Sequence, residues 1–315
     1  MNDILTITLN PAVDLATSVE HVIAGPKLYC KTPLIHPGGG GVNVARAICK
    51  LGGQATALVA VGGPTGERLL DLLASEAVPT SPVPVSGETR ESFAVTDETT
   101  GQQYRFSVPG PTLSAQDGQS LLAAIGAAVT PDSFVVLSGG LAAGLDVTFP
   151  DRILAAIKPV SDRLIVDTSR GALAHLIQRR ADPVHLLRID QKEAAQAAEH
   201  AMATVADSVT FAQTLVDRGV ARIVVTGRGA DGSIMVTQTQ AFFCHAPKVT
   251  VRSKIGAGDA FVGAMTLALA RGAPPDQALR WGVAAASATV GTQGTALCER
   301  QMTEDLFEDC IIEVI

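Results

Sequence analysis

The chain of 315 residues lacks several features that would each assign it to a class of protein. It has no run of about 18 uncharged apolar residues, so it is not expected to span a membrane. Its first residues, MNDILTITLN, lack the basic start and apolar core of a secretory signal, and we expect them to form a first strand. A net charge of −7 and a pI of about 5.4 argue against a broad nucleic-acid surface but allow a local anion pocket.

Cysteine is too sparse to build a framework. The five cysteines are scattered, odd in number and form no C-x-x-C pair. A disulfide scaffold or a structural zinc site is therefore not expected, and the pattern is typical of a protein in the reducing cytoplasm. The chain also has no long linker, low-complexity run or fixed-period repeat, which predicts one domain over residues 1–315.

The 47% of apolar residues are arranged in β-branched runs that alternate with Ala- and Leu-rich helical patterns. Such continuous apolar strands are typical of a mostly parallel sheet covered by helices on both faces, so the fold class is predicted to be α/β. The predicted strands are Ile4–Thr8, Ala55–Val61, Phe134–Ser138, Leu164–Asp167, His185–Ile189 and Arg222–Thr226. The predicted helices cover residues 42–51, 66–75, 114–128, 148–158, 171–179 and 191–217.

Two segments interrupt this alternation, residues 13–36 and 86–108. The second resembles a hairpin with a Gly-containing turn, and we expect both segments to form a small β lid beside the main sheet. If residue 97 lies opposite 102, then residue 94 faces 105, and Arg90 and Arg105 share one face because strand faces repeat every two residues. The two guanidinium groups could then hold an anion, or they could be solvated surface arginines. Residues 232–245 are predicted to form a further antiparallel pair.

The segment PGGGGVNVARAICKLGG, residues 37–53, places four glycines before a predicted helix. Four consecutive glycines cost conformational entropy, and they are useful where the backbone must approach a ligand closely. We therefore expect the backbone at 38–41 and the side-chain amide of Asn43 to bind a ligand. The alternative is a flexible turn that only starts the helix.

The stretch GRGADG, residues 227–232, matches the G-x-G-x-x-G pattern, yet a predicted strand follows it instead of a helix. No acidic residue lies about 20 positions further on, as a dinucleotide site would require. We interpret the stretch as a turn between strands that lies against a nucleotide. The pattern G-x-x-x-x-G-K-S/T is absent, which excludes a P-loop enzyme.

The stretch GAGDAF, residues 256–261, lies where a loop is predicted to enter a helix. Backbone N–H groups and the positive end of the helix dipole make such a start an anion site. Asp259 could simply stabilise the dipole, an effect worth about 0.3–1 kcal/mol. Ser or Thr would cap a helix without the entropic cost of two glycines, however. Glycine amides beside a carboxylate instead suggest phosphoryl transfer, with the carboxylate accepting a hydroxyl proton.

These motifs together resemble the PfkB-type carbohydrate kinases of the ribokinase superfamily. The resemblance runs almost end to end, and it includes NPAVD at 10–14, GGGGVNVARAICKLGG at 38–53, GPTGE at 63–67, QYRF at 103–106 and GAGDAFVGAM at 256–265. TLNPAVD, GPKLYC, GQQYRF and QGTALC are most similar to the branch that acts on sugar phosphates. The implied fold is a ribokinase-like three-layer sandwich with a β lid, and lids of two subunits are expected to pack together in a homodimer.

The resemblance implies ATP-dependent phosphorylation of a sugar phosphate, with fructose 6-phosphate converted to fructose 1,6-bisphosphate as the expected reaction. Mg²⁺ and a monovalent cation such as K⁺ are the implied ions. The implied catalytic residues are Asp259 as general base and Gly256, Ala257 and Gly258 as the anion hole. The implied substrate-binding residues are Asp14, Lys27, Gly38, Gly39, Gly40, Gly41, Asn43, Arg90, Arg105 and Ser138. The implied nucleotide-binding residues are Arg188, Asp190, Thr226, Gly229 and Gly232. The residue implied to organise Mg²⁺ is Glu193.

Three positions depart from the pattern of the sugar-phosphate branch. Gly140 stands where a serine is expected to touch the substrate phosphate. Asp190 replaces an asparagine near the nucleotide phosphates, which is electrostatically unfavourable unless Mg²⁺ or Arg188 neutralises it. Lys254 precedes the GAGD block where Thr-x is common, and its ammonium group could take the place of a monovalent cation.

These departures leave several alternatives open. The acceptor could be another sugar phosphate, namely tagatose 6-phosphate or fructose 1-phosphate. It could also be an unphosphorylated sugar, which Gly140 favours and the two lid arginines disfavour. A degenerate family member that binds ligand without catalysis is the remaining alternative. The complete GAGD start weighs against it, because a binding protein has no need of the carboxylate.

Overall fold

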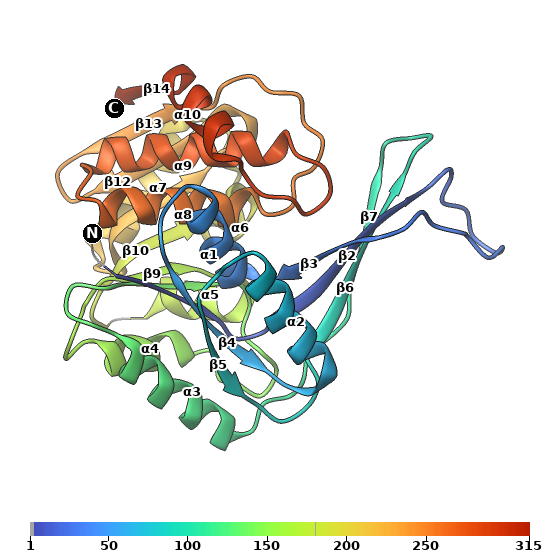
Figure 1. Cartoon of the computed structure of the whole chain (residues 1–315). Coiled ribbons are helices and arrows are strands. Elements are labelled where there is room, and N and C mark those ends of the chain that lie inside the picture. Colours follow the sequence, from blue (N-terminus) through green and yellow to red (C-terminus); the bar gives the residue numbers. More distant parts are fainter. Residues whose placement is uncertain (1–2, 180) are drawn as a thin grey trace.

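The computed structural model describes residues 3–179 and 181–315, and its main feature is a ten-stranded sheet (Figure 1). The strand order is β14-β13-β12-β11-β10-β9-β8-β1-β4-β5. The seven strands from β11 to β5 pair in parallel, and β12, β13 and β14 add an antiparallel edge. The strands are β1 (Ile4–Thr8), β4 (Thr56–Val61), β5 (Thr80–Pro84), β8 (Phe134–Ser138), β9 (Leu164–Asp167), β10 (Val184–Ile189), β11 (Ala221–Gly227), β12 (Gly232–Thr237), β13 (Ala241–His245) and β14 (Ile311–Val314).

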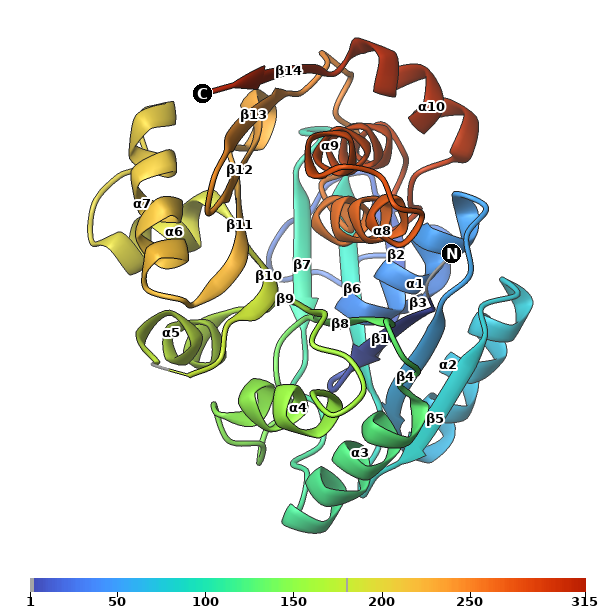
Figure 2. The same ribbon diagram turned by 90° about the vertical axis from the view of Figure 1, so that its left-hand side faces the viewer.

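Helices cover both faces of this sheet, as the continuous apolar strands predict (Figure 2). One apolar cluster lies under α1, α2, α8 and α9, and a second lies under α3 to α7. The helices are α1 (Gly40–Lys50), α2 (Gly63–Ser75), α3 (Ala115–Ala128), α4 (Phe149–Ile157), α5 (Arg170–Gln178), α6 (Gln191–Ala198), α7 (Val205–Asp217), α8 (Ala257–Ala270), α9 (Pro275–Val290) and α10 (Arg300–Asp309). The predicted α/β sandwich of three layers is confirmed.

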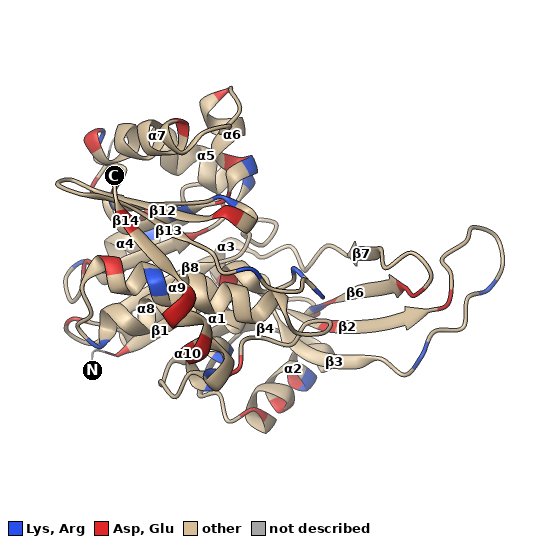
Figure 3. Ribbon diagram, turned by 90° about the horizontal axis from the view of Figure 1, so that it is seen from above, with Lys and Arg blue, Asp and Glu red and all other residues tan. Residues whose placement is uncertain are grey.

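A second sheet of four strands projects to one side of the sandwich and forms the lid (Figures 1 and 3). Its strands are β2 (Ala12–Val19), β3 (Leu34–Gly38), β6 (Arg90–Asp97) and β7 (Gln103–Ser107), in the order β3-β2-β6-β7. Ala94 pairs with Arg105, so the predicted register of the hairpin is confirmed. The lid therefore combines the two segments that interrupted the strand–helix alternation.

Two expectations about helix boundaries are wrong. Residues 191–217 form two helices, because Glu199 adopts a left-handed conformation with φ of 58° and ends α6. Thr204 then starts α7 with a capping box to Asp207. The four glycines are also expected to precede α1, but the helix begins at Gly40, so Gly40 and Gly41 lie in its first turn. Gly39, with φ of 112°, is the N-cap residue.

The predicted pair at 232–245 is confirmed as β12 and β13, which a short 3₁₀ turn at Gly229–Asp231 joins to β11. Among the residues that the structure describes, no helix is both long and apolar enough to cross a membrane.

Candidate active site

Most of the predicted site residues lie at one edge of the main sheet, where its parallel strands end. Thr8 ends β1, Ser138 ends β8 and Asp167 ends β9. After β1, the chain adds β4 and β5 on one side of that strand, and it then adds β8 and β9 on the other side. The direction in which strands are added therefore reverses between β1 and β8. Such a switch point is where open α/β sheets bind ligands. The first turns of α1 and α8 reach the same edge.

A cleft of about 690 Å³ opens at this edge, between the sheet and the base of the lid. Its size is ordinary for a small-molecule site. Its polar lining includes Thr8, Asn10, Arg90, Ser138 and Arg170. Backbone from the glycine-rich segments at 39–40 and 139–140 completes the wall, which lets a ligand approach the main chain closely.

Asp259 lies in the first turn of α8 and is held from two other elements. The side-chain amide of Asn43, on α1, donates a hydrogen bond of 2.9 Å to Oδ2 of Asp259. The Ser138 hydroxyl lies 3.3 Å from Oδ1 of Asp259 and 3.4 Å from Oδ2 of Asp167, so it donates to one of the two carboxylates. The structure thus brings together three residues that are far apart in the sequence.

The surroundings of Asp259 make its charged form unfavourable. Loss of solvent, followed by repulsion from the Asp167 carboxylate, raises the pKa of Asp259 to about 7. The hydrogen bond from Asn43 and the charge of Arg188 oppose this rise. A carboxylate with a pKa near neutrality is suited to accept a proton and release it again.

A buried arginine fixes the orientation of Asn43. Arg46 is 2% exposed and pairs with both carboxylate oxygens of Glu76 at 2.7 Å. Its Nη1 donates to the Pro37 carbonyl at 3.0 Å and to Oδ1 of Asn43 at 3.1 Å. Because the amide oxygen of Asn43 accepts from Arg46, its NH₂ group is directed toward Asp259.

On the lid, Asp14 and the two predicted arginines share one face of the sheet. Asp14 pairs with Ser92 across β2 and β6, and Ala94 pairs with Arg105 across β6 and β7. Burial raises the pKa of Asp14, while Arg90 and Arg105 act to lower it. A Cβ atom at Gly38 would lie 2.2 Å from Oδ2 of Asp14, which explains the glycine there.

Arg90 is already held in place before any ligand binds. Its Nε donates to Oδ1 of Asn10 at 3.2 Å, and its Nη1 donates to the Ser107 hydroxyl at 2.7 Å. Arg105, by contrast, is exposed on β7. The pair therefore offers one anchored and one more mobile cation on the face of the lid that carries Asp14.

A second cationic group lies against the start of α8. The guanidinium of Arg188 is 3.2 Å from Oδ1 of Asp167, and a Cβ at Gly258 would lie 3.2 Å from its nitrogens. Glycine at 258 thus allows the arginine to cover the helix N-terminus. The first N–H groups of α8, at Ala257 and Gly258, have no acceptor within the helix. N–H groups and a guanidinium in this arrangement are suited to bind an anion beside the Asp259 carboxylate.

Asp190 and Glu193 form a reciprocal capping box at the start of α6. The Asp190 carboxylate accepts from the Glu193 N–H at 2.8 Å, and the Glu193 carboxylate accepts from the Asp190 N–H at 3.0 Å. The departure at 190 therefore preserves a helix cap. Within residues 3–179 and 181–315 no three His, Cys, Asp or Glu side chains gather as a metal site. Asp190 and Glu193 are half-buried carboxylates, the kind of oxygen donor that Mg²⁺ takes directly or through water.

The three residues predicted to line a nucleotide have different environments. The Thr226 hydroxyl is buried without a hydrogen-bond partner in the protein, which leaves its predicted contact with a nucleotide as a prediction. A Cβ at Gly229 would meet no atom within 4 Å, and the turn there is open. At Gly232, with φ of 123°, a Cβ would lie 2.0 Å from the Cys244 carbonyl oxygen, so strand pairing alone requires this glycine.

Comparison with known proteins decides the family. Residues 4–302 match the description of a pfkB family carbohydrate kinase. The chain belongs to the PfkB family. It is 38% identical to the ATP-dependent 6-phosphofructokinase isozyme 2 of Mycobacterium tuberculosis, over 97% of this chain and 89% of that protein. It is 37% identical to the isozyme 2 of Escherichia coli, over 96% and 97% of the two chains.

The crystal structures of phosphofructokinase-2 from E. coli share this fold. Its potassium complex superposes with a TM-score of 0.92 at 37% identity, and its fructose-6-phosphate complex with a TM-score of 0.91 at 36% identity. Each covers 98% of this chain and 99% of the other. The PfkB kinase described here is accordingly a phosphotransferase that acts on carbohydrate.

Sequence reasoning missed several polar residues of the PfkB site, among them Asp167, Thr8, Arg170 and Arg46. It placed the carboxyl ends of five of the six predicted core strands correctly, and the sixth strand, β11, ends at Gly227, one residue beyond the predicted Thr226. Asp167 could have been found, because it ends a predicted strand where α/β sheets bind ligands. Thr8 offered the same signal. Arg170, with φ of 56°, and the buried Arg46 gave no sequence signal. Lys27 is exposed in the loop between β2 and β3 and is not among the residues that line the cleft of this subunit, so its role in ligand binding stays a prediction.

The raised pKa of Asp259 has a cost in stability. As pH rises from about 4 to about 7, the unfolded carboxyl ionises before the folded one, so the free energy of unfolding falls. Asp259→Asn removes this penalty, and we expect the variant to have a higher melting temperature than the parent at pH 8. The difference should shrink toward pH 4.5. Thermal unfolding followed by circular dichroism across this range measures it.

Asp71→Asn, which changes an exposed carboxyl on α2, is the matched control. A melting-temperature difference for Asp259→Asn that stays constant from pH 4.5 to 8 would contradict the assigned pKa.

Proposed function

We propose that this PfkB kinase transfers the γ-phosphoryl group of ATP to fructose 6-phosphate, giving fructose 1,6-bisphosphate. The observation that carries the proposal is the Asp259 carboxylate, which lies in the first turn of α8 and 3.3 Å from the hydroxyl of Ser138, a residue that lines the cleft beneath the lid. The names of the relatives, and the fructose-6-phosphate complex of the E. coli protein, support the choice of substrates.

In this proposal Asp259 takes the proton from the acceptor hydroxyl as the hydroxyl oxygen attacks the γ-phosphorus. Asn43 and Ser138 hold the carboxylate in position. The amides of Ala257 and Gly258 and the guanidinium of Arg188 stabilise the charge that develops on the transferring group. When bound with ATP, Mg²⁺ neutralises the nucleotide phosphates, and Glu193 is the residue that we expect to orient its water ligands.

The lid supplies the acceptor side of the proposed site. Asp14 binds sugar hydroxyls together with the glycine backbone at 38–41, while Arg90 and Arg105 hold the phosphate already on the sugar. Gly140 lines the cleft, and a Cβ there would meet no atom within 4 Å. The phosphate therefore has room at this position, and the arginines must supply the contacts that a serine would have shared.

In this proposal the nucleotide binds at Thr226 and at the open turn around Gly229. Asp190 contributes indirectly, because its carboxylate caps the start of α6. K⁺ is proposed as a second ion because the E. coli relative was crystallised in complex with potassium. Lys254 is exposed in the loop before α8. Its exposed side chain gives no support to the alternative in which it replaces the cation.

The first test is release of ADP from Mg-ATP in the presence of fructose 6-phosphate. We expect steady turnover, and a loss of at least about 10²-fold in kcat for Asp259→Asn, the usual size of a general-base effect. Turnover of the parent should also rise with pH through about 7, because only the ionised carboxylate can accept the proton.

Parallel assays with tagatose 6-phosphate, fructose 1-phosphate and fructose separate the alternatives. A higher kcat/KM for one of these would reassign the acceptor and leave the kinase intact. If the folded protein turned over none of the four sugars, the alternative of a family member that binds ligand without catalysis would be favoured. Near-normal turnover by the Asp259→Asn variant would rule out Asp259 as the general base.

The lid arginines give a second prediction. Arg90→Gln and Arg105→Gln should each lower kcat/KM for fructose 6-phosphate by about 10–100-fold, since each removes charged hydrogen bonds to phosphate worth about 1.5–3 kcal/mol. Rates with unphosphorylated fructose should change little. Arg68→Gln, on α2 beside the lid, is the control. Equal losses with both sugars would mean that the arginines only support the lid.

We further propose that two lids pack together in a homodimer. Phe93 and Phe106 pair on the face of the lid opposite Arg105, and they are 38% and 56% exposed. Exposed aromatic side chains on a projecting sheet are typical of an association surface. The E. coli relative is known in a tetrameric inhibited form, which supports the proposal that this chain self-associates.

Phe106→Glu should convert the dimer to a monomer in size-exclusion chromatography with light scattering, because it places a charge in an apolar interface. Val314→Glu, which changes an exposed apolar residue on β14, should leave the dimer unchanged. A parent protein that is monomeric, or a dimer that only Val314→Glu dissociates, would refute the lid interface.

A further inference from the structure

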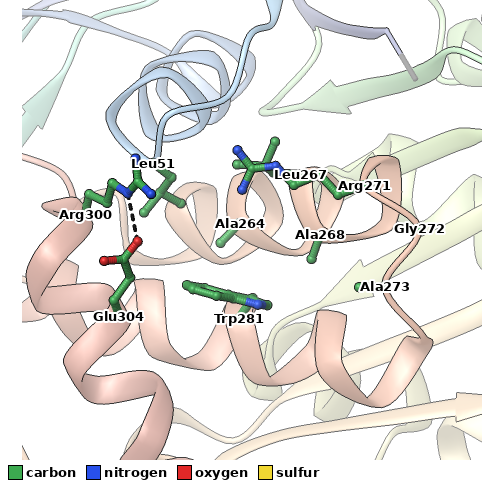
Figure 4. A pocket seen from close by; sticks show the side chains of 10 residues that line it. All are labelled: Leu51, Ala264, Leu267, Ala268, Arg271, Gly272, Ala273, Trp281, Arg300 and Glu304. Carbon is green, nitrogen blue, oxygen red and sulfur yellow. Dashed lines mark hydrogen bonds and ion pairs between the residues drawn. The ribbon is translucent and has the colours of Figure 1, made fainter. Parts of the chain in front are cut away.

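A second pocket lies at the opposite ends of the two helices that begin at the active site (Figure 4). It has a volume of about 360 Å³ and is bounded by the C-terminal ends of α1 and α8 together with α9 and α10. Asp259 and Ala268 are separated by about 14 Å along α8, from the rise of 1.5 Å per residue. We call this cavity the α10 pocket; its lining comprises Leu51, Ala264, Leu267, Ala268, Arg271, Gly272, Ala273, Trp281, Arg300 and Glu304.

The floor of the α10 pocket is apolar and rigid. Leu51 from α1 and Leu267 from α8 lie opposite the indole of Trp281 from α9 (Figure 4). The indole stacks on the ring of Phe307, with centroids 4.4 Å apart and an angle of 28° between the rings. A stacked aromatic ring is held in one orientation, so its free face offers a flat apolar surface to a ligand.

Two guanidinium groups converge on one point at the edge of this floor. Nη2 of Arg271 donates to the Gly52 carbonyl at 3.0 Å, and a Cβ at Gly52 would lie 3.0 Å from Nη1 of Arg300. Nε of Arg300 pairs with Glu304 at 2.7 Å. Among the described residues these are the only polar partners of the two arginines, so most of their ten N–H donors stay available.

The arginines are not needed to cap the helices around them. At the end of α1, Gly52 N–H and Gly53 N–H bond to the carbonyls of Cys49 and Ile48. At the end of α8, the N–H groups at 272 and 273 bond to the carbonyls of Leu269 and Ala268. Both helices thus end in Schellman-type turns that satisfy these four carbonyls without the arginines, and the one carbonyl that Arg271 contacts, at Gly52, lies beyond the end of α1. Two cations over an apolar floor remain to be explained.

We propose that the α10 pocket binds a small amphipathic carboxylate, a monoanion with an aromatic or aliphatic body. The planar guanidinium groups match a carboxylate, while Trp281 and the two leucines accept the apolar body. Glu304 cancels one of the two positive charges, which favours a monoanion over a phosphate dianion. The volume lies at the lower end of the range of about 300–1,000 Å³ for ligand pockets, which limits the body to about one ring.

The chain contains a single tryptophan, Trp281, so its fluorescence reports this pocket alone. The probe is 3-phenylpropionate, and the matched neutral compound is 3-phenylpropionamide. We expect a saturable fluorescence change with the carboxylate at a Kd of about 1 mM or tighter, and at least about tenfold weaker binding of the amide. The assay does not use turnover, so it stands independently of the proposed kinase reaction.

Variants test the charge argument in both directions. Arg271→Gln and Arg300→Gln should each weaken binding of the carboxylate about tenfold, while Glu304→Gln should strengthen it several-fold by removing the competing anion. Damage to the fold could not strengthen binding. Arg222→Gln removes a positive charge from β11, outside the pocket, and should have no effect.

Three results would overturn the proposal. These are no saturable change with 3-phenylpropionate, equal binding of the acid and the amide, or weaker binding in Glu304→Gln. Circular dichroism of each variant ensures that the protein compared is folded.

Discussion

The hydrogen bond from the Asn43 amide to the Asp259 carboxylate joins the first turns of α1 and α8, which are 216 residues apart in sequence. Arg46 sets the direction of this bond by donating to the amide oxygen of Asn43. The Glu76 carboxylate pairs with the buried charge of Arg46, which would otherwise be costly to desolvate. A buried ion pair contributes little net stability, because desolvation offsets most of the attraction. Here the ion pair matters for geometry, because it fixes the direction of the Asn43 NH₂ group and, through it, the position of the Asp259 carboxylate.

The rest of the site is arranged around the charge of that carboxylate. Loss of solvent and the Asp167 carboxylate oppose ionisation of Asp259, while Asn43 and Arg188 favour it, and together they raise its pKa to about 7. Arg188, which favours the ionised carboxylate, is also part of the proposed anion site beside it. In the proposed reaction one set of electrostatic interactions would therefore act on both partners of the phosphoryl transfer, and glycine at 258 allows Arg188 to lie so close.

The lid separates its two roles by the alternation of a β-strand. Residues at even steps from Asp14 and Ala94 carry the charged groups on one face, and Phe93 and Phe106 occupy the other. The proposed sugar-phosphate contacts and the proposed dimer interface therefore lie on opposite faces of the lid.

The sequence alone determined the fold class, the strands of the main sheet except β5 and β14, the lid and its register, and the loop-to-helix start at Asp259. Each depends on local periodicity or on turn residues, which the chain expresses directly. It failed within 191–217, where a left-handed Glu199 divides a continuous helical pattern, and it gave no sign of Arg46, Arg170 or the α10 pocket. These depend on which side chains meet across elements distant in sequence, so only the tertiary structure decided them. The shifted pKa of Asp259 belongs with them, because desolvation and neighbouring charge exist only once the chain is packed.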